Sequence, residues 1–562
     1  MNKILRILSK EYGSINQAAL LLGFFAFLSQ VLALFRDRSI AYFIGPSSSL
    51  DAYYAAFRIP DLIFISVASL ASITVLIPFI VEKMDDGKVT LKAQKFLNDI
   101  FTVFFVSIIF ISAIIFFLMP FLVSIIAPGF TGEMQDKLIV LSRLMLLSPI
   151  LMGLSNLFGT VTQLFRKFFI YSLSPILYNI GIIVGVIFFY PTFGVYGLAL
   201  GVVLGAFMHF AVQAIASYSC GLSPKFSSSI SSINFKEIKR VATTSLPRTL
   251  GLSFNNIALI AIISLASFLK GGSISIFNLS LNLQSVPLNI IGISYAVAAF
   301  PTLTKSISAG KIEEFRKHLK SAARAIVFWS IPVIFLFIVV RAQIVRVILG
   351  SGSFSWENTR LVAACLAIFS VSILAQGMIA LLSRAYYANG NTTRPLVINF
   401  ICSTLIIILS FVFIHLFENW VFFHHFIESL LKVDDIEGTA VLMLPLAYST
   451  GTILNAILYW YFVRRDFMKG ESFITNTFFQ SLGASFFLGL VAYLSLNILS
   501  PIFGTTTFLG VFLQGFISGI LGIFSAVLVL HLLKNEELKD VLNTLHTKFW
   551  KAKVLAPSQE EL

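Results

Sequence analysis

The chain has 562 residues, of which 57% are hydrophobic and only 12% are charged, so its polar surface is too small to cover a soluble fold of this size. Its 40 lysines and arginines exceed its 26 acidic residues, which gives a formal net charge of +14. This excess lies in short loops between apolar runs and does not form the basic face with stacking aromatics that nucleic-acid binding needs. The composition therefore indicates an integral membrane protein and argues against a nucleic-acid partner.

Apolar stretches of about 20 residues, long enough to cross a bilayer, recur along the whole chain. They predict an all-α polytopic membrane protein with about fourteen transmembrane helices. The expected spans are 15–43, 51–82, 97–127, 138–165, 169–190, 193–219, 238–269, 274–304, 322–349, 361–388, 395–416, 439–463, 476–499 and 507–533. The first residues, MNKILRILSKEYG, contain no small-residue cleavage site, so we expect the first span to act as an uncleaved signal.

The basic residues alternate from loop to loop along these spans. One side begins with Lys3, Arg6 and Lys10 and ends with the basic segment after the last span. The other side is nearly bare, since GPSSSL has no charge and APGFTGEMQDK is mixed. Basic loops are retained in the cytoplasm, so an even number of spans predicts both termini on the cytoplasmic side.

Two pairs of motifs recur at a similar separation. The segment FRKFFIYSLSPILYN ends in Pro175-x-x-x-Asn179, and SRAYYANGNTTRPLVIN ends in Pro395-x-x-x-Asn399. In the second pair, AYFIGPSSSLDAYYAAFRIP and ASFLKGGSISIFNLSLNLQSVP each cross a Gly/Ser turn into a proline-marked span. Two homologous halves explain both pairs, as in many transporters, although proline-marked bends also recur in unrelated polytopic proteins.

The repeat predicts two pseudo-symmetric six-helix lobes. We expect an N-terminal lobe at 1–221, a C-terminal lobe at 222–470, two extra transmembrane helices at 471–534 and a cytoplasmic amphipathic tail at 535–562. The basic, amphipathic tail is expected to lie on the membrane surface. The segment ENWVFFHHFIESLLKVDDIEG, between the eleventh and twelfth spans, has the Trp, Phe and Glu spacing of an interfacial helix.

Ionisable residues inside the apolar spans are the main candidates for a functional site, because a charge at membrane depth needs a wet cavity or a partner. Arg36 and Asp37 lie late in the first span, Asp51 opens the second, and Arg58 lies two residues before Pro60. An arginine fork binds phosphate oxygens bidentately, which suits a pyrophosphate-bearing substrate. The alternative is a purely structural Arg36–Asp37 ion pair. Further substrate-binding candidates on later spans are Arg248, Asn255, Asn282, Gln284 and Arg384.

Patterns typical of catalysis or cofactor binding are missing from the sequence. It has no Walker-type glycine loop, no H-E-x-x-H motif and no nucleophile elbow. Cys220, Cys365 and Cys402 have no paired spacing, which argues against disulfides, zinc or a redox motif. We therefore expect a transporter without catalytic residues, metal or cofactor.

Four segments resemble the MurJ (MviN) family of lipid II flippases, within the multidrug/oligosaccharidyl-lipid/polysaccharide exporter superfamily. They are SQVLALFRD with LDAYYAAFRIPDL, APGF, FPTLTKS and AYYANGNTTRP. The resemblance implies two six-helix lobes around a V-shaped cavity, two extra C-terminal helices, and alternating access that turns the lipid-linked peptidoglycan precursor outward. It places Arg36, Asp37, Asp51 and Arg58 at the family's charged positions.

The chain also departs from that family pattern. The family usually has arginine where this chain has Gln30, Phe64 and Asn282, and an E-G-A segment where it has residues 69–71, Ser-Leu-Ala. The resemblance therefore implies a less cationic cavity than usual. Compensation by Arg248 and Arg384 from other helices is a hypothesis.

The leading interpretation is a flippase for lipid II in the bacterial cytoplasmic membrane, driven by the membrane potential or a coupled ion, with membrane lipids as its other partners. A flippase for another polyprenyl-pyrophosphate-linked glycan is the close alternative. A drug/cation antiporter would favour a carboxylate-lined cavity, which the later spans do not provide. The alternative outside the transporters is a degenerate membrane scaffold that has lost its substrate site and transports nothing.

Overall fold

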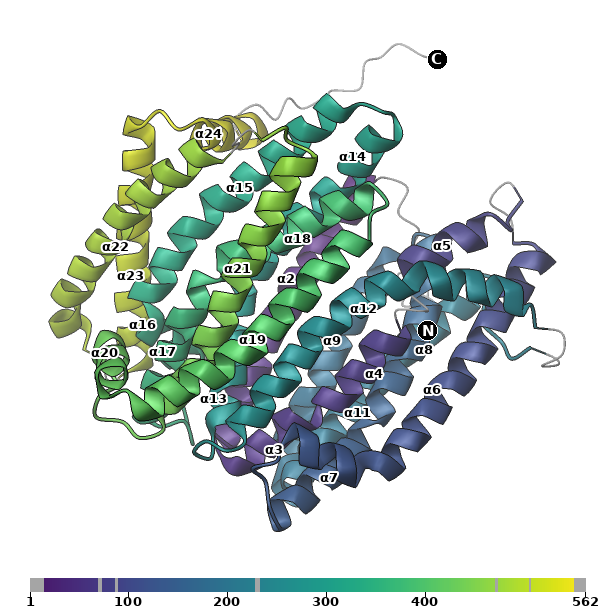
Figure 1. Cartoon of the computed structure of the whole chain (residues 1–562), viewed down its shortest axis with the longest axis horizontal. Helices are drawn as coiled ribbons and strands as arrows, with labels where there is room; N and C mark the ends of the chain where they lie inside the picture. Colours follow the sequence, from purple (N-terminus) through teal and green to yellow (C-terminus); the bar gives the residue numbers. More distant parts are fainter. Residues whose placement is uncertain are drawn as a thin grey trace. The chain divides into compact units, whose positions relative to one another are not determined.

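The computed structural model describes residues 15–68, 73–85, 89–227, 233–470, 474–504 and 507–549. Every regular element in these ranges is a helix (Figure 1). The helices form two compact units. The first comprises Met1–Leu283, Ile348–Cys365 and Thr392–Gly451, and the second comprises Gln284–Val347, Leu366–Asn391 and Thr452–Leu562.

The membrane spans agree with the sequence prediction in most places. Among the described residues, eleven helices are long and apolar enough to cross a bilayer. A twelfth span arises if α17 (Trp356–Val371) and α18 (Ile373–Ala388), which are bent by 41° at their junction, count as one. These twelve correspond to the third to fourteenth predicted spans. The all-helical membrane fold is confirmed, and the count of fourteen is compatible with it.

The first two predicted spans have a different character. Span 15–43 is the single helix α2 (Ile15–Phe43), whereas span 51–82 is divided into α3 (Ser48–Ala56), α4 (Arg58–Ala68) and α5 (Ile73–Val81). Pro60 lies in the first turn of α4, where its missing N–H group costs no intrahelical hydrogen bond. The second span is therefore broken close to the charged positions that the sequence singled out.

Most of the first unit consists of long helices from the N-terminal half of the chain, joined by helices from farther along it. They are α6 (Leu91–Ile126), α7 (Glu133–Met145), α8 (Leu147–Leu164), α9 (Phe168–Val184), α11 (Val195–Tyr218), α12 (Phe235–Ala266), α19 (Thr393–Asn419) and α20 (Val421–Leu431). Helix α13 (Ser273–Leu288) begins in this unit and ends in the second, and α21 (Met443–Asp466) does the same.

Glycines allow α9, and the π-helical turn Gly185–Phe189 that follows it, to approach α11 backbone to backbone. A Cβ atom on Gly181 would lie 2.3 Å from the Cα atom of Gly205, and one on Gly185 would lie 2.5 Å from the Cα atom of Gly201. In lipid, no hydrophobic force drives helices together, and small residues spaced four apart on facing helices commonly allow close packing of the backbones. A larger side chain at either position forces these helices apart.

The repeated Pro-x-x-x-Asn motif makes equivalent contacts in the two halves of the sequence. Asn179 on α9 donates a hydrogen bond to the Ser29 hydroxyl on α2 (3.4 Å). Asn399 on α19 donates to the Gly251 carbonyl on α12 (3.5 Å). In each half, the helix that the motif opens thus contacts the helix of the first predicted span of that half. The lobe and tail boundaries predicted from the sequence remain predictions, because compact packing units and repeat units are different properties.

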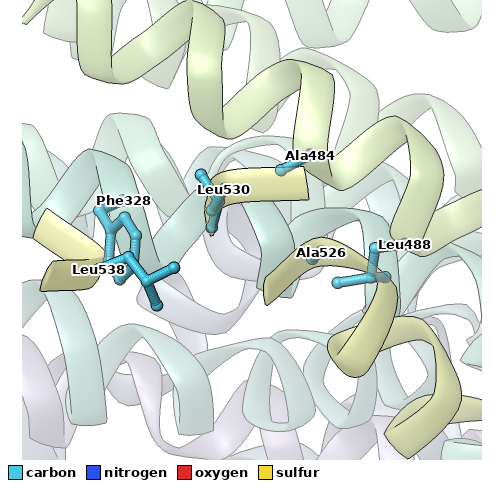
Figure 2. Packing of buried hydrophobic residues seen from close by; sticks show 6 residues of the cluster. All are labelled: Phe328, Ala484, Leu488, Ala526, Leu530 and Leu538. Carbon is cyan, nitrogen blue, oxygen red and sulfur yellow. The ribbon is translucent and has the colours of Figure 1, made fainter. Parts of the chain in front are cut away.

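The second unit contains the C-terminal helices. It includes α14 (Ser294–Ser308), α15 (Ile312–Val339), α22 (Thr475–Phe503), α23 (Phe508–Leu532) and α24 (Glu536–Phe549). Figure 2 shows where α24 joins this group: Leu538 lies beside Phe328 of α15, and the same cluster contains Leu530 of α23 and Leu488 of α22. Arg324 of α15 also pairs with a carboxylate in the first turn of α24 (2.9 Å). Part of the apolar face of the tail helix therefore packs on protein, where the sequence favoured the membrane surface.

Candidate functional site

Arg36 and Asp37, near the end of α2, form a hydrogen-bonded pair. The Arg36 Nε and Nη2 groups both donate to Asp37 Oδ1 (2.9 and 2.8 Å), and Nη1 donates to Asn179 Oδ1 (3.1 Å). The other carboxylate oxygen of Asp37, Oδ2, accepts from Asn282 Nδ2 (3.1 Å). The Asp37 side chain is 4% exposed and the Arg36 side chain 20%. The network connects α2, α9 and α13.

This geometry leaves Arg36 able to bind an anion. A guanidinium group has five N–H donors, and three of them are used by Asp37 and Asn179. The remaining donors belong to the two terminal nitrogens, and the side chain retains some exposure. Asp37, by contrast, has both oxygens bonded and is buried, so it orients the arginine. The same contacts also fit the alternative of a structural ion pair, since they tie three helices together.

Two amides complete this network. Asn179 was not among the candidates from the sequence, although its place in the repeated Pro-x-x-x-Asn motif was a signal that could have found it. Asn282 stands where the family resemblance leads one to expect arginine, and it keeps a hydrogen bond to Asp37 without adding positive charge. The departure therefore lowers the local charge while preserving a donor.

Asp51, in the first turn of α3, caps the start of α13. Its Oδ2 accepts from the Gly272 N–H (2.6 Å), and its Oδ1 accepts from both the N–H (2.7 Å) and the hydroxyl (2.6 Å) of Ser275. The residue is 2% exposed. A carboxylate at a helix N-terminus satisfies unpaired N–H groups and interacts favourably with the helix dipole. The geometry favours an anchoring role for Asp51, and substrate contact by this residue stays a prediction.

Close contacts join the segments that, according to the distribution of basic residues among the loops, lie on the external side of the membrane. The Ser353 N–H donates to the Tyr42 carbonyl (2.9 Å), and a Cβ atom on Gly45 would lie 2.5 Å from the Ser353 carbonyl oxygen. Gly129 N–H donates to the Ser267 hydroxyl (2.9 Å). Together with the Asp51 cap, these contacts between segments 42–51, 127–132, 267–275 and 349–354 form what we call the outer junction. It is tightly closed.

The remaining candidates of the first unit are dispersed. Arg58 Nη2 donates to Asn278 Oδ1 (2.5 Å), a partner that the sequence did not suggest. The Arg58 Nε atom is buried and has no hydrogen-bond partner among the described residues. Asn255 on α12 is exposed. Arg248 lies in the same helix, but its side chain is outside the described residues, as are residues 69–71. The structure thus brings Arg36, Asp37 and Asn282 together.

Two candidates belong to the second unit. Gln284 is fully buried, and neither atom of its amide has a hydrogen-bond partner within the part of the chain that the structure describes. Arg384 on α18 donates to the Ala380 carbonyl of its own helix (2.8 Å). Among the residues that the structure describes, no group of three or more His, Cys, Asp or Glu side chains could hold a metal ion.

Comparison with known proteins identifies relatives along most of the chain. The family model MurJ, described as "Lipid II flippase MurJ", matches residues 40–513. A probable lipid II flippase MurJ of Borreliella burgdorferi is 26% identical over 495 residues, which cover 84% of this chain and 95% of that protein. One of Rickettsia prowazekii is 26% identical over 387 residues, which cover 68% of this chain and 74% of that protein.

Solved structures share the fold. "Lipid II flippase MurJ, inward closed conformation" has a TM-score of 0.72 at 20% identity, covering 92% of this chain and all (100%) of the solved one. An inward-facing multidrug resistance MATE family transporter of the MOP superfamily has a TM-score of 0.62 at 16% identity, covering 78% of this chain and 95% of the other. At these identities the likeness concerns the fold alone.

Proposed function

Since this chain belongs to the MurJ family of lipid II flippases, we propose that it carries lipid II from the inner to the outer leaflet of the bacterial cytoplasmic membrane by alternating access. In this proposal both termini are cytoplasmic, as the loop charges predict. Lipid II and the surrounding lipids are its partners, and the membrane potential or a coupled ion drives transport.

The observation that carries the proposal is the Arg36 guanidinium, which among the described residues uses three of its five N–H donors. Lipid II presents a pyrophosphate, and a guanidinium binds such oxygens through parallel N–H bonds without losing its proton. Asp37 and Asn179 hold the guanidinium in one orientation before the substrate arrives, which lowers the entropy lost on binding. Arg36 therefore receives the pyrophosphate, and Asp37 positions Arg36.

Alternating access also requires a closed and an open outer end. The outer junction supplies the closed form, because Asp51 and the glycine contacts join segments from both halves of the sequence. Release of the headgroup outward requires these hydrogen bonds to break. A junction of short hydrogen bonds and backbone contacts separates as a unit, which suits a two-state transition.

A second candidate is a flippase for another polyprenyl-pyrophosphate-linked glycan. It is favoured by Gln30, Phe64 and Asn282, which stand where the family resemblance expects arginine. All such substrates share the pyrophosphate, so Arg36 keeps its role, and the difference lies in how the sugar and peptide are recognised.

Expression in a bacterium depleted of its own lipid II flippase tests the proposal. We expect the wild-type protein to restore growth, wall synthesis and the amount of lipid II accessible at the outer face. An inactive control is the host carrying an empty vector at the same depletion. Failure of a folded, membrane-inserted protein to expose lipid II, combined with exposure of a different lipid-linked glycan, would support the second candidate. Exposure of neither glycan would contradict both.

A further inference from the structure

Helix α20 turns away from the membrane span that precedes it. Trp420 separates α20 from α19 and has an extended backbone conformation (φ −114°, ψ 95°). In Figure 1, α20 is seen end-on at the lower end of α19, whereas α19 runs across the view. The helix therefore lies across the axis of the span, as a helix in the plane of a membrane surface does.

One face of α20 exposes large apolar side chains in a row. Phe422 is 69% exposed, Phe426 52% and Leu430 62%, at a spacing of four residues that places them on one stripe. We call these three residues the α20 stripe. The rings of Phe422 and Phe426 stack with centroids 6.2 Å apart. Beside the stripe, His425 and Ser429 are also exposed, so the apolar row has a polar edge.

The opposite face of α20 is fixed to the protein. Glu428 is 6% exposed, accepts a hydrogen bond from the Thr439 hydroxyl (2.6 Å) and lies 2.9 Å from His424 Nε2. The His424 ring stacks on Phe417 of α19 with centroids 4.1 Å apart. These contacts set the rotation of α20 about its own axis, so the outward direction of the stripe is built into the fold.

Two carboxylates of the loop after α20 pair with basic side chains of other segments. Asp435 accepts from Arg360 at the start of α17 (Nη1 to Oδ2, 2.7 Å). Glu437 accepts from Lys270 in the loop before α13 (2.8 Å). The loop 432–438 is therefore tethered through two carboxylates, one of which pairs with Lys270 of the outer junction.

A lipid surface is the partner that these features fit best. The exposed residues of α20 include no Asp, Glu, Lys or Arg, because Glu428, the charged residue of the helix, is buried. The span before it, α19, also exposes large apolar side chains, such as Ile408 (52%) and Phe411 (57%). Trp420, which separates α19 from α20, is 53% exposed, and Trp is enriched where spans meet the membrane–water interface.

We propose that α20 is a lipid-docking helix whose stripe inserts at the boundary between headgroups and acyl chains. The loop 432–438 stays paired to protein, so docking ties the outer junction to the level of the bilayer surface. Insertion removes three large apolar side chains from water, which is the driving force for interfacial helices. The assignment to the outer leaflet rests on the proposed topology, whereas the docking itself does not depend on which lipid is transported.

Fluorescence quenching in nanodiscs tests the proposal. A cysteine at Phe426, labelled with an environment-sensitive dye, is compared with one at exposed Asp434, in a variant whose native cysteines, Cys220, Cys365 and Cys402, are serine. We expect the dye at 426 to be quenched by lipids spin-labelled near the glycerol and to be at least about threefold less sensitive to aqueous iodide. The dye at 434 should show the reverse.

Two outcomes overturn the inference. Equal iodide quenching at both positions means that the stripe faces water. Protection of position 426 from both quenchers means that protein covers it, as a second copy or another subunit would. The unmodified protein gives an independent readout, because a phospholipid with a photoreactive group at the glycerol should label residues 420–431. Labelling of α19 without labelling of α20 contradicts docking, and neither readout depends on transport.

Discussion

Replacement of Asp51 by alanine should loosen the outer junction. The substitution removes three hydrogen bonds to the start of α13 and leaves the N–H groups of Gly272 and Ser275 without their acceptor. Loss of a helix cap costs about 0.5–2 kcal/mol, and each buried N–H left unpaired costs about 1–3 kcal/mol. These contributions overlap, so we take about 3 kcal/mol as the free energy by which the closed junction loses stability relative to the open one. This corresponds to an increase of roughly a hundredfold in the ratio of open to closed junction. Asp51→Asn keeps one acceptor oxygen and should shift the equilibrium less.

The labelling rate of a buried cysteine at the junction measures this shift. Ser273 is 2% exposed, so a cysteine there reacts with a membrane-impermeant maleimide only when the junction opens. We expect Asp51→Ala to raise the rate by up to about a hundredfold, in proportion to the open fraction. Asp434→Asn, the same loss of charge at an exposed carboxylate on the same side, should leave it unchanged.

A folded Asp51→Ala variant that labels no faster than the parent protein would contradict this expectation. The hydrogen bonds to α13 would then contribute nothing to closure. A lower thermal unfolding temperature without faster labelling would mean that Asp51 stabilises the whole protein and has no specific role in closing the outer junction.

The other predictions concern packing and pH. Gly185→Val, which forces a side chain toward Gly201, should destabilise the protein by about 1–3 kcal/mol in thermal unfolding, whereas Gly23→Ala, with no atom within 4 Å of the new Cβ, should not. Leu538→Ala should lower the free energy of unfolding by about 2 kcal/mol or more and detach α24, which faster hydrogen exchange in 536–549 would detect. Unchanged exchange would contradict the packing of α24 that Figure 2 shows. The hydrogen bonds from Arg360 lower the pKa of Asp435, so this tether is complete above the ordinary carboxyl pKa and is lost as pH falls through the lowered value. Hydrogen exchange of loop 432–438, corrected for intrinsic rates, should therefore stay constant from about pH 8 to about pH 5 and rise only below about pH 4; a rise near neutral pH contradicts the assignment.

Most of the fold follows from the sequence, because long apolar runs determine which segments span the bilayer and basic loops determine their orientation, and both are local properties of the sequence. The break in the second span was harder to see. Its residues are apolar enough for one helix, and only Pro60 and the charges nearby indicated a boundary. The division into two packing units depends on contacts between distant segments, which local patterns do not encode.

The candidate site shows the same limit. The sequence identified Arg36 and Asp37 as unusual at membrane depth, and their burial could be expected. The sequence could not show that Asp51 lies against the start of α13, because Asp51 and its partner Gly272 are 221 positions apart in the chain. Membrane depth alone suggests function for any charge, and only the partners separate an anchoring carboxylate from a ligand-binding arginine.

In the proposed mechanism, Arg36 holds the pyrophosphate of lipid II during transport. This role is tested by the amount of lipid II accessible at the outer face of flippase-depleted cells that carry either the wild-type protein or Arg36→Ala at equal membrane abundance. We expect the wild type to restore outward lipid II and Arg36→Ala not to restore it. Equal restoration by Arg36→Ala would contradict it and leave the Arg36–Asp37 pair as architecture.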